Sequence, residues 1–185
     1  MEAITFWEKF NKHICHNPEL VAAWNYPKMF TNIIMDTLEH QVLGNSNLKT
    51  EREYFRIDLI GYESNASSTL LTGNLQKYSW NLKVAVEHEN DYRLWVDEVV
   101  KLAHIVCPLR VVIGYLPKNK KYDHQSVFSE VTKNLKEVAA WESSSKVGEF
   151  LLIIGDCKVE EKTDRCVYTP YRYNPKTDAF EPLQK

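Results

Sequence analysis

The sequence predicts an α/β fold in which helices flank a mixed central β-sheet. Three observations lead to this class. Two stretches near the middle of the chain alternate their residues with the period of two that is typical of strands. Other stretches repeat their apolar residues with the helical period. In the second half of the chain helices and buried strands alternate, which indicates βαβ units.

The first half of the chain begins with helices and continues with strands. Residues 4–15 are expected to form a short helix, and residues 28–42 form a second one after Pro27. Gly44 and the polar stretch that follows end this second helix. Residues 53–62 and 78–89 alternate as strands do, and the first of them has one fully apolar face. These two predicted strands follow each other in the chain with no helix between them, which fits a hairpin.

The second half predicts helix, strand, helix and strand. Residues 92–106 form a helix that Pro108 ends, and the almost wholly apolar residues 109–116 form a buried strand. A basic loop, a helix over 125–141 and a last buried strand over 150–156 follow. We therefore expect one domain over residues 1–185, and its parts are a helical extension (1–27), a core (28–156) and an irregular C-terminal tail (157–185).

Composition narrows the class of protein further. A chain of 185 residues with 44% hydrophobic residues can bury a core, and 12% aromatic residues argue against general disorder. Its apolar runs are far shorter than the roughly 20 residues of a membrane span, and residues 1–10 do not read as a secretion signal. We expect no membrane association, a cytoplasmic location and reduced cysteines. The net charge of −2 gives no direct argument for nucleic-acid binding.

Sequence motifs exclude several chemistries. The six glycines are isolated, so no dinucleotide fingerprint or phosphate loop is present. A serine nucleophile elbow is also missing. The spacing of cysteines and histidines does not match a structural zinc site.

Three carboxylates are the most informative candidates for a site. Asp58 lies in one predicted strand, and Glu87 and Glu89 lie two residues apart in the next. Residues i and i+2 of a strand share a face, and two adjacent carboxylates repel each other when they are desolvated. A Mg²⁺ ion removes this cost, because it prefers carboxylate oxygens and leaves room for water and phosphate. A solvated strand face explains the same spacing without a metal.

The arrangement of these residues resembles the core of the PD-(D/E)XK, or restriction-endonuclease-like, superfamily. That core runs helix, three strands, helix, strand, with an Asp in one strand and a Glu-x-Lys at the end of the next. The resemblance covers residues 28–156 and rests on three segments: Arg-Ile-Asp-Leu-Ile-Gly-Tyr (56–62), Leu-Lys-Val-Ala-Val-Glu-His-Glu-Asn (82–90) and Leu-Arg-Val-Val-Ile-Gly-Tyr (109–115).

Two positions depart from the family motif. Ile57 stands where the family often has Pro, and Glu89 stands where it usually has Lys. Some members carry Glu-x-Glu, and others move the lysine to a neighbouring position. Lys101 on the following helix, or Lys83 on the strand of the acids, is then the candidate for the missing charge.

The resemblance implies a nuclease that hydrolyses phosphodiester bonds of DNA with Mg²⁺, for which Mn²⁺ substitutes. Asp58 and Glu87 would be metal ligands, Glu89 would activate the attacking water, and an acid in the family's first helix suggests Glu39 as a further ligand. The residues expected to contact nucleic acid are basic: Lys83, Lys118, Lys120 and Lys121. A homodimer is implied by resemblance alone.

Two other readings remain open at this stage. The chain is a non-catalytic module on the same fold that acts with a protein or nucleic-acid partner, since fold does not determine function. Alternatively, it is an unrelated α/β interaction protein, in which the face of Glu87 and Glu89 is solvated. For Glu39 and for the basic loop, an ordinary solvated surface is the stronger explanation.

Overall fold

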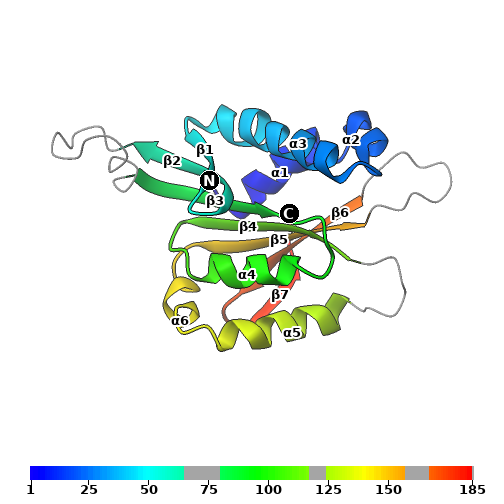
Figure 1. Cartoon of the computed structure of the whole chain (residues 1–185). Helices are drawn as coiled ribbons and strands as arrows, with labels where there is room; N and C mark the ends of the chain where they lie inside the picture. Colours follow the sequence, from blue (N-terminus) through cyan, green and yellow to red (C-terminus); the bar gives the residue numbers. More distant parts are fainter. Residues whose placement is uncertain (65–79, 117–123, 157–166, 185) are drawn as a thin grey trace.

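The computed structural model describes residues 1–64, 80–116, 124–156 and 167–184, and these ranges form one seven-stranded sheet with helices on both faces (Figure 1). The predicted class, a mixed sheet flanked by helices, is confirmed. The strands are β1 (Lys49–Tyr54), β2 (Ile57–Ser64), β3 (Trp80–His88), β4 (Leu109–Tyr115), β5 (Glu149–Asp156), β6 (Val167–Asn174) and β7 (Ala179–Pro182).

The strands lie in the sheet in the order in which they follow in the chain. The pairs β3–β4 and β4–β5 are parallel, and the other four are antiparallel. The helix α4 (Trp95–Ala103) connects β3 to β4. The helices α5 (His124–Lys136) and α6 (Trp141–Ser144) connect β4 to β5. Parallel neighbours need such crossovers, whereas an antiparallel pair can be joined by a short turn, as β1 and β2 are.

The remaining helices precede the sheet in the chain and cover its other face (Figure 1). They are α1 (Ala3–His13), α2 (Pro18–Ala23), α3 (Pro27–Thr37), a π-helical turn η1 (Leu38–Leu43) and a 3₁₀ turn η2 (Gly44–Ser46). The predicted second helix thus changes its winding at Leu38, and α2 lies in a segment for which no helix is predicted from the sequence.

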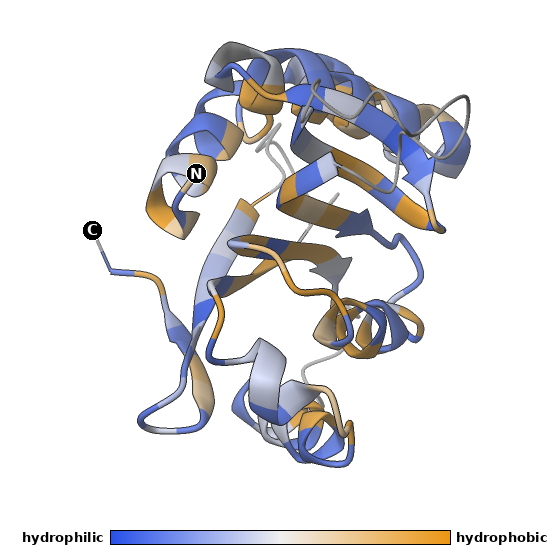
Figure 2. Cartoon of the chain, turned by 90° about the vertical axis from the view of Figure 1, so that its left-hand side faces the viewer, coloured by the Kyte–Doolittle hydropathy of each residue, from blue (hydrophilic) through white to orange (hydrophobic). Residues whose placement is uncertain are grey.

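The sheet separates two apolar cores. Leu59, Val86 and Val111 pack under α1 and α3, whereas Ile60 and Val112 pack under α4 and α5. This alternation along each strand follows from the two-residue period of the pleat. The central strands carry much of the strongly apolar sequence (Figure 2), and every residue of β4 is buried.

Within the sheet, the structure differs from the sequence expectations at two further places. The strand expected over residues 53–62 is a hairpin, because the chain turns at Phe55 and Arg56, whose φ angles are 49° and 65°. Positive φ at both central residues is the geometry of a tight turn whose twist matches the strands. The tail expected to be irregular contributes β6 and β7, which extend the sheet beyond β5.

No helix within the described ranges is both long enough and apolar enough to cross a membrane.

Candidate functional site

Two carboxylates face each other on neighbouring strands. Asp58 is the second residue of β2, and Glu87 is the last but one of β3. Leu59 pairs with Val86 in the antiparallel ladder, so the next residues along each strand, Asp58 and Glu87, also lie opposite each other. Both share the sheet face covered by α4, because their neighbours two positions away, Ile60 and Ala85, belong to that core. The pairing of these two acids, expected from the sequence, is present in the structure.

The helix α4 adds a cation to the two acids. Lys101 Nζ lies 2.8 Å from Glu87 Oε1 and also pairs with the Glu98 carboxylate one turn earlier on the helix. The contact with Glu87 is close enough for an ion pair, although its alignment is poor for a hydrogen bond. Lys101 Nζ also donates to the carbonyl of Arg56, at 2.9 Å. The site therefore combines groups from β2, β3, α4 and the β1–β2 turn.

Burial controls the electrostatics of this cluster. Glu87 is 0% exposed, and its Oε2 atom has no hydrogen-bond partner among the described residues. Burial raises the pKa of Glu87 to about 9 and outweighs Lys101, which lowers it, while Asp58 raises it further. Burial also raises the pKa of Asp58. The backbone N–H of His88 donates to this carboxylate at 2.8 Å and lowers the pKa, but by less than burial raises it. A buried carboxylate with a raised pKa beside a second carboxylate is a site that gains from a cation.

Lys101 responds to the same neighbours in the opposite direction. Burial alone would lower its pKa, but its bonds to Glu87 and Glu98 outweigh burial and raise it. Lys101 thus stays charged. Glu98 is not among the residues predicted from the sequence, although its spacing of three residues from Lys101 on a predicted helix indicates such a pair.

Glu89 lies just beyond β3, where its backbone N–H donates to the carbonyl of Ile113 at 3.0 Å. Its Oε1 accepts from the backbone N–H of Asp91 at 2.7 Å. The Glu89 carboxylate therefore makes a local hydrogen bond, within the turn that leads to α4.

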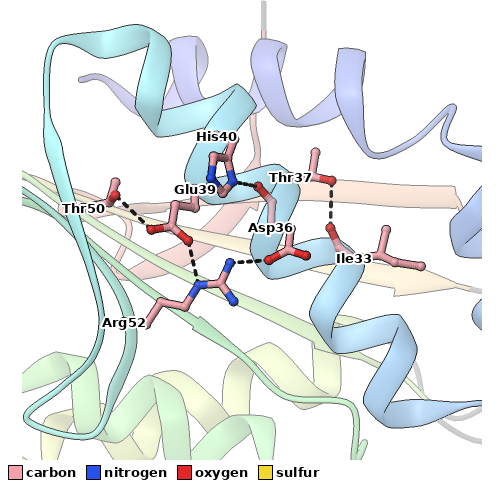
Figure 3. A network of polar contacts seen from close by, with 7 residues as sticks. All are labelled: Ile33, Asp36, Thr37, Glu39, His40, Thr50 and Arg52. Carbon is pink, nitrogen blue, oxygen red and sulfur yellow. Dashed lines mark hydrogen bonds and ion pairs between the residues drawn. The ribbon is translucent and has the colours of Figure 1, made fainter.

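The structure does not bring Glu39 together with Asp58 and Glu87. Glu39 belongs to η1, where Oε1 accepts from Thr50 Oγ1 at 3.1 Å and Oε2 accepts from Arg52 Nε at 2.7 Å (Figure 3). Its partners are on β1, and η1 packs on the sheet face opposite to α4. The expected metal ligand is instead part of a network that fixes the edge strand to the helix.

Of the expected nucleic-acid contacts, the structure describes Lys83. Lys83 lies four residues before Glu87 on β3 and pairs with Glu63 Oε2 at 3.0 Å. Lys118, Lys120 and Lys121 lie outside the described residues.

A different basic and aromatic feature lies at the acids, at the tip of the β1–β2 hairpin. Phe55 is 60% exposed, and Arg56 is exposed and makes no ion pair within the described ranges. The Arg56 carbonyl is held by Lys101, so the tip lies next to the acid cluster. Sequence reasoning missed this feature because it placed both residues inside a strand.

The side chain of His88 lies on the other face of the sheet from Glu87. Its Nε2 is 2.9 Å from the hydroxyl of Tyr115, which in turn is 3.2 Å from the hydroxyl of Tyr168. Burial lowers the pKa of His88 to about 3, so the ring is neutral. The last two residues of β3 thus present a buried acid to α4 and a buried neutral imidazole to α3.

The donor set fits a hard cation held by few protein ligands. Within the described ranges no three His, Cys, Asp or Glu side chains are grouped as a complete metal cage. Mg²⁺ rarely uses such a cage, since one or two carboxylates, waters and substrate phosphates complete its coordination. The buried Oε2 of Glu87, with no partner among the described residues, is the atom that such an ion would satisfy.

Comparison of the chain with family models, with curated proteins and with solved structures finds no match.

Proposed function

We propose that this protein is a metal-dependent nuclease with a restriction-endonuclease-like core, and that it hydrolyses phosphodiester bonds of DNA. The observation that carries the proposal is the meeting of Asp58 and Glu87 on paired strands with Lys101 from α4. Two acids and one lysine are the groups that the family's motif supplies. Here the lysine comes from the helix, in place of the motif position that Glu89 occupies.

The order of elements supports the same proposal. The helix α3 precedes three antiparallel strands, β1 to β3, and α4 then leads to β4, which is parallel to β3. This is the order of helix, three strands, helix and strand that the resemblance implies. The acids lie at the start of β2 and the end of β3, where the motif has its acids.

Asp58 and Glu87 would hold Mg²⁺, or Mn²⁺ in its place. When bound, such an ion polarises a phosphoryl oxygen and lowers the pKa of bound water. Lys101 supplies a fixed positive charge beside the place where the phosphate gains negative charge. Glu98 positions Lys101 from the same helix, and exposed Arg56 is placed to pair with a backbone phosphate. Activation of water by Glu89 stays a prediction.

A second function is favoured by one observation. Glu87, with a pKa of about 9, holds a proton at neutral pH, and Lys101 pairs with Glu98, so the cluster is electrically satisfied without a metal. In a non-catalytic module on the same fold, these groups would serve to hold α4 against the sheet. Such a module would act with a protein or nucleic-acid partner.

Metal titration tests the proposal without knowledge of the substrate. We would titrate Mn²⁺ and Mg²⁺ into wild-type protein, Asp58→Asn and Glu87→Gln by calorimetry. The matched control is Glu63→Gln, which changes an exposed acid on the strand of Asp58. We expect both site variants to weaken binding at least about tenfold, as loss of a charged ligand does, with the control unchanged.

Cleavage is tested next, with supercoiled plasmid in Mg²⁺ and in chelator. Wild type should nick the plasmid only with the metal, and Lys101→Met should bind metal but fail to nick. Metal binding that is absent, or that is the same in both site variants, would favour the non-catalytic module.

A further inference from the structure

A second charged feature lies on the same sheet face but is directed away from the acids. Arg110, the second residue of β4, is 0% exposed. Its Nη2 donates to the carbonyls of Ser144 and Val147, at 2.8 and 3.1 Å. Both carbonyls lie near the start of β4, in the segment where α6 leads into β5. Its Nε and Nη1 have no hydrogen-bond partner, and no carboxylate pairs with it among the described residues.

An unpaired buried cation is costly, because burial removes its hydration. Two aromatic rings offset part of this cost, since the guanidinium carbon lies 5.2 Å from the Phe150 ring centroid and 5.7 Å from that of Trp141. The two carbonyls satisfy only one of the three nitrogens. Burial lowers the pKa of Arg110, yet an arginine remains charged at neutral pH. An anion is the partner that this arrangement lacks.

A pocket of about 440 Å³ lies against Arg110 at the edge of the sheet where β5 begins and β6 ends. Two more cations, Arg172 and Lys176, line it, and both are exposed. Glu149 is the acid among its described lining residues. The Glu149 carboxylate is already engaged, since Oε1 pairs with Arg172 Nη1 at 3.2 Å and Oε2 accepts the Ala3 N–H at 2.7 Å. The walls of the pocket therefore carry an excess of positive charge.

We propose that this pocket binds a phosphate group, with Arg172 and Lys176 as direct ligands and Arg110 as the buried charge behind them. The phosphate is supplied either by free inorganic phosphate or by a phosphomonoester such as a nucleotide. The inference is independent of the nuclease proposal, because it involves neither Asp58 nor Glu87. It explains why a strand that is otherwise apolar keeps a fully buried arginine.

The test compares inorganic phosphate and AMP with chloride at equal ionic strength, by calorimetry and by thermal unfolding. Wild type should bind phosphate saturably and unfold at a higher temperature in phosphate. The double variant Arg172→Met/Lys176→Met should bind at least about tenfold more weakly, because it loses two charge-assisted contacts. Lys146→Met, which removes an exposed lysine outside the pocket, is the matched control and should bind as wild type. Tighter binding of AMP than of phosphate would identify a phosphomonoester, and the reverse would identify the free ion.

Arg110→Met separates the buried charge from the direct ligands. In chloride the stability of this variant serves only as its own reference, because Met also removes the donor to the carbonyls of Ser144 and Val147. In phosphate it should lose the gain in unfolding temperature. If Arg110→Met does not fold, the exposed double variant still decides. No saturable phosphate binding by wild type, or equal binding by the double variant, would overturn the proposal.

Discussion

Gly114 on β4 determines how closely α4 approaches the sheet, so Gly114→Ala is a direct test of the packing beneath the candidate site. A Cβ at this position would lie 2.6, 2.8 and 3.0 Å from three carbons of Trp95, the first residue of α4. Carbon atoms in contact normally lie about 3.5–4.0 Å apart, so the start of α4 must retreat by about 1 Å. Trp95 is 1% exposed and has no open space to turn into. Overpacking of this kind costs about 1–3 kcal/mol, and we expect the upper half of that range.

Urea unfolding measures the cost, with Gly61→Ala on β2 as the control. The Cβ of that control meets the end of the Leu48 side chain at 3.1 Å, which a small rotation of a flexible group relieves. Its loss should stay below about 1 kcal/mol. Trp95→Leu in the Gly114→Ala background should recover part of the stability, which would show that the two sites are coupled. Equal stability of Gly114→Ala and wild type, or equal losses in both alanine variants, would refute the reasoning.

Three further predictions concern charge. Lys101→Met should cost about 1–2 kcal/mol in urea unfolding at pH 10, above the pKa of Glu87 of about 9, where the ion pair is charged. The loss is smaller than for a fully buried pair because Lys101 is partly exposed, and the further change Glu87→Gln should recover most of it. The pKa of His88 is about 3 in the fold but about 6.5 in the unfolded chain, which therefore binds the proton first. Stability should fall by roughly 1.4 kcal/mol per pH unit below pH 6.5, and His88→Phe should flatten that slope. Arg56→Met should weaken DNA binding for every sequence and lower the salt dependence by about one phosphate contact, as fluorescence anisotropy would show.

The alternation of apolar and polar residues predicted much of the sheet. It identified β3 and β4 nearly to their ends and assigned Asp58 and Ile60 to one face. The alternation did not predict the turn at Phe55 and Arg56. A two-residue hairpin turn usually contains Asn or Gly, and neither is present here. β6 was missed because Pro170 and its tyrosines do not alternate clearly. The strand forms because β5 offers it a partner from Leu151 to Asp156, which is information outside the segment itself.

The candidate site was predictable where it depends on strand geometry alone. The proximity of Glu87 and Asp58 follows from the register of two paired strands. The contact of Lys101 with Glu87 depends instead on how α4 crosses the sheet. A helix contributes a residue every 100° or so, and the sequence does not fix its rotation over a strand. Glu39 was misplaced for the same reason, because η1 turns it toward Arg52 on the opposite face. Alternation within a strand therefore predicts which side chains share a face of the sheet, whereas the sequence of a helix does not predict which strand residue a helix residue contacts.

Lys101 separates the two functions proposed for the acid cluster. If the lysine serves only as a counter-ion, replacing both it and Glu87 by apolar residues should be neutral or stabilising, as with other buried ion pairs. If the cluster is a metal site, Lys101 and the metal are two cations near one carboxylate. Lys101 lies at Oε1 of Glu87, and Oε2, which has no hydrogen-bond partner among the described residues, is free for the metal. Lys101→Met would then raise metal affinity while it abolishes cleavage. A counter-ion role alone gives no reason for those two measurements to move in opposite directions.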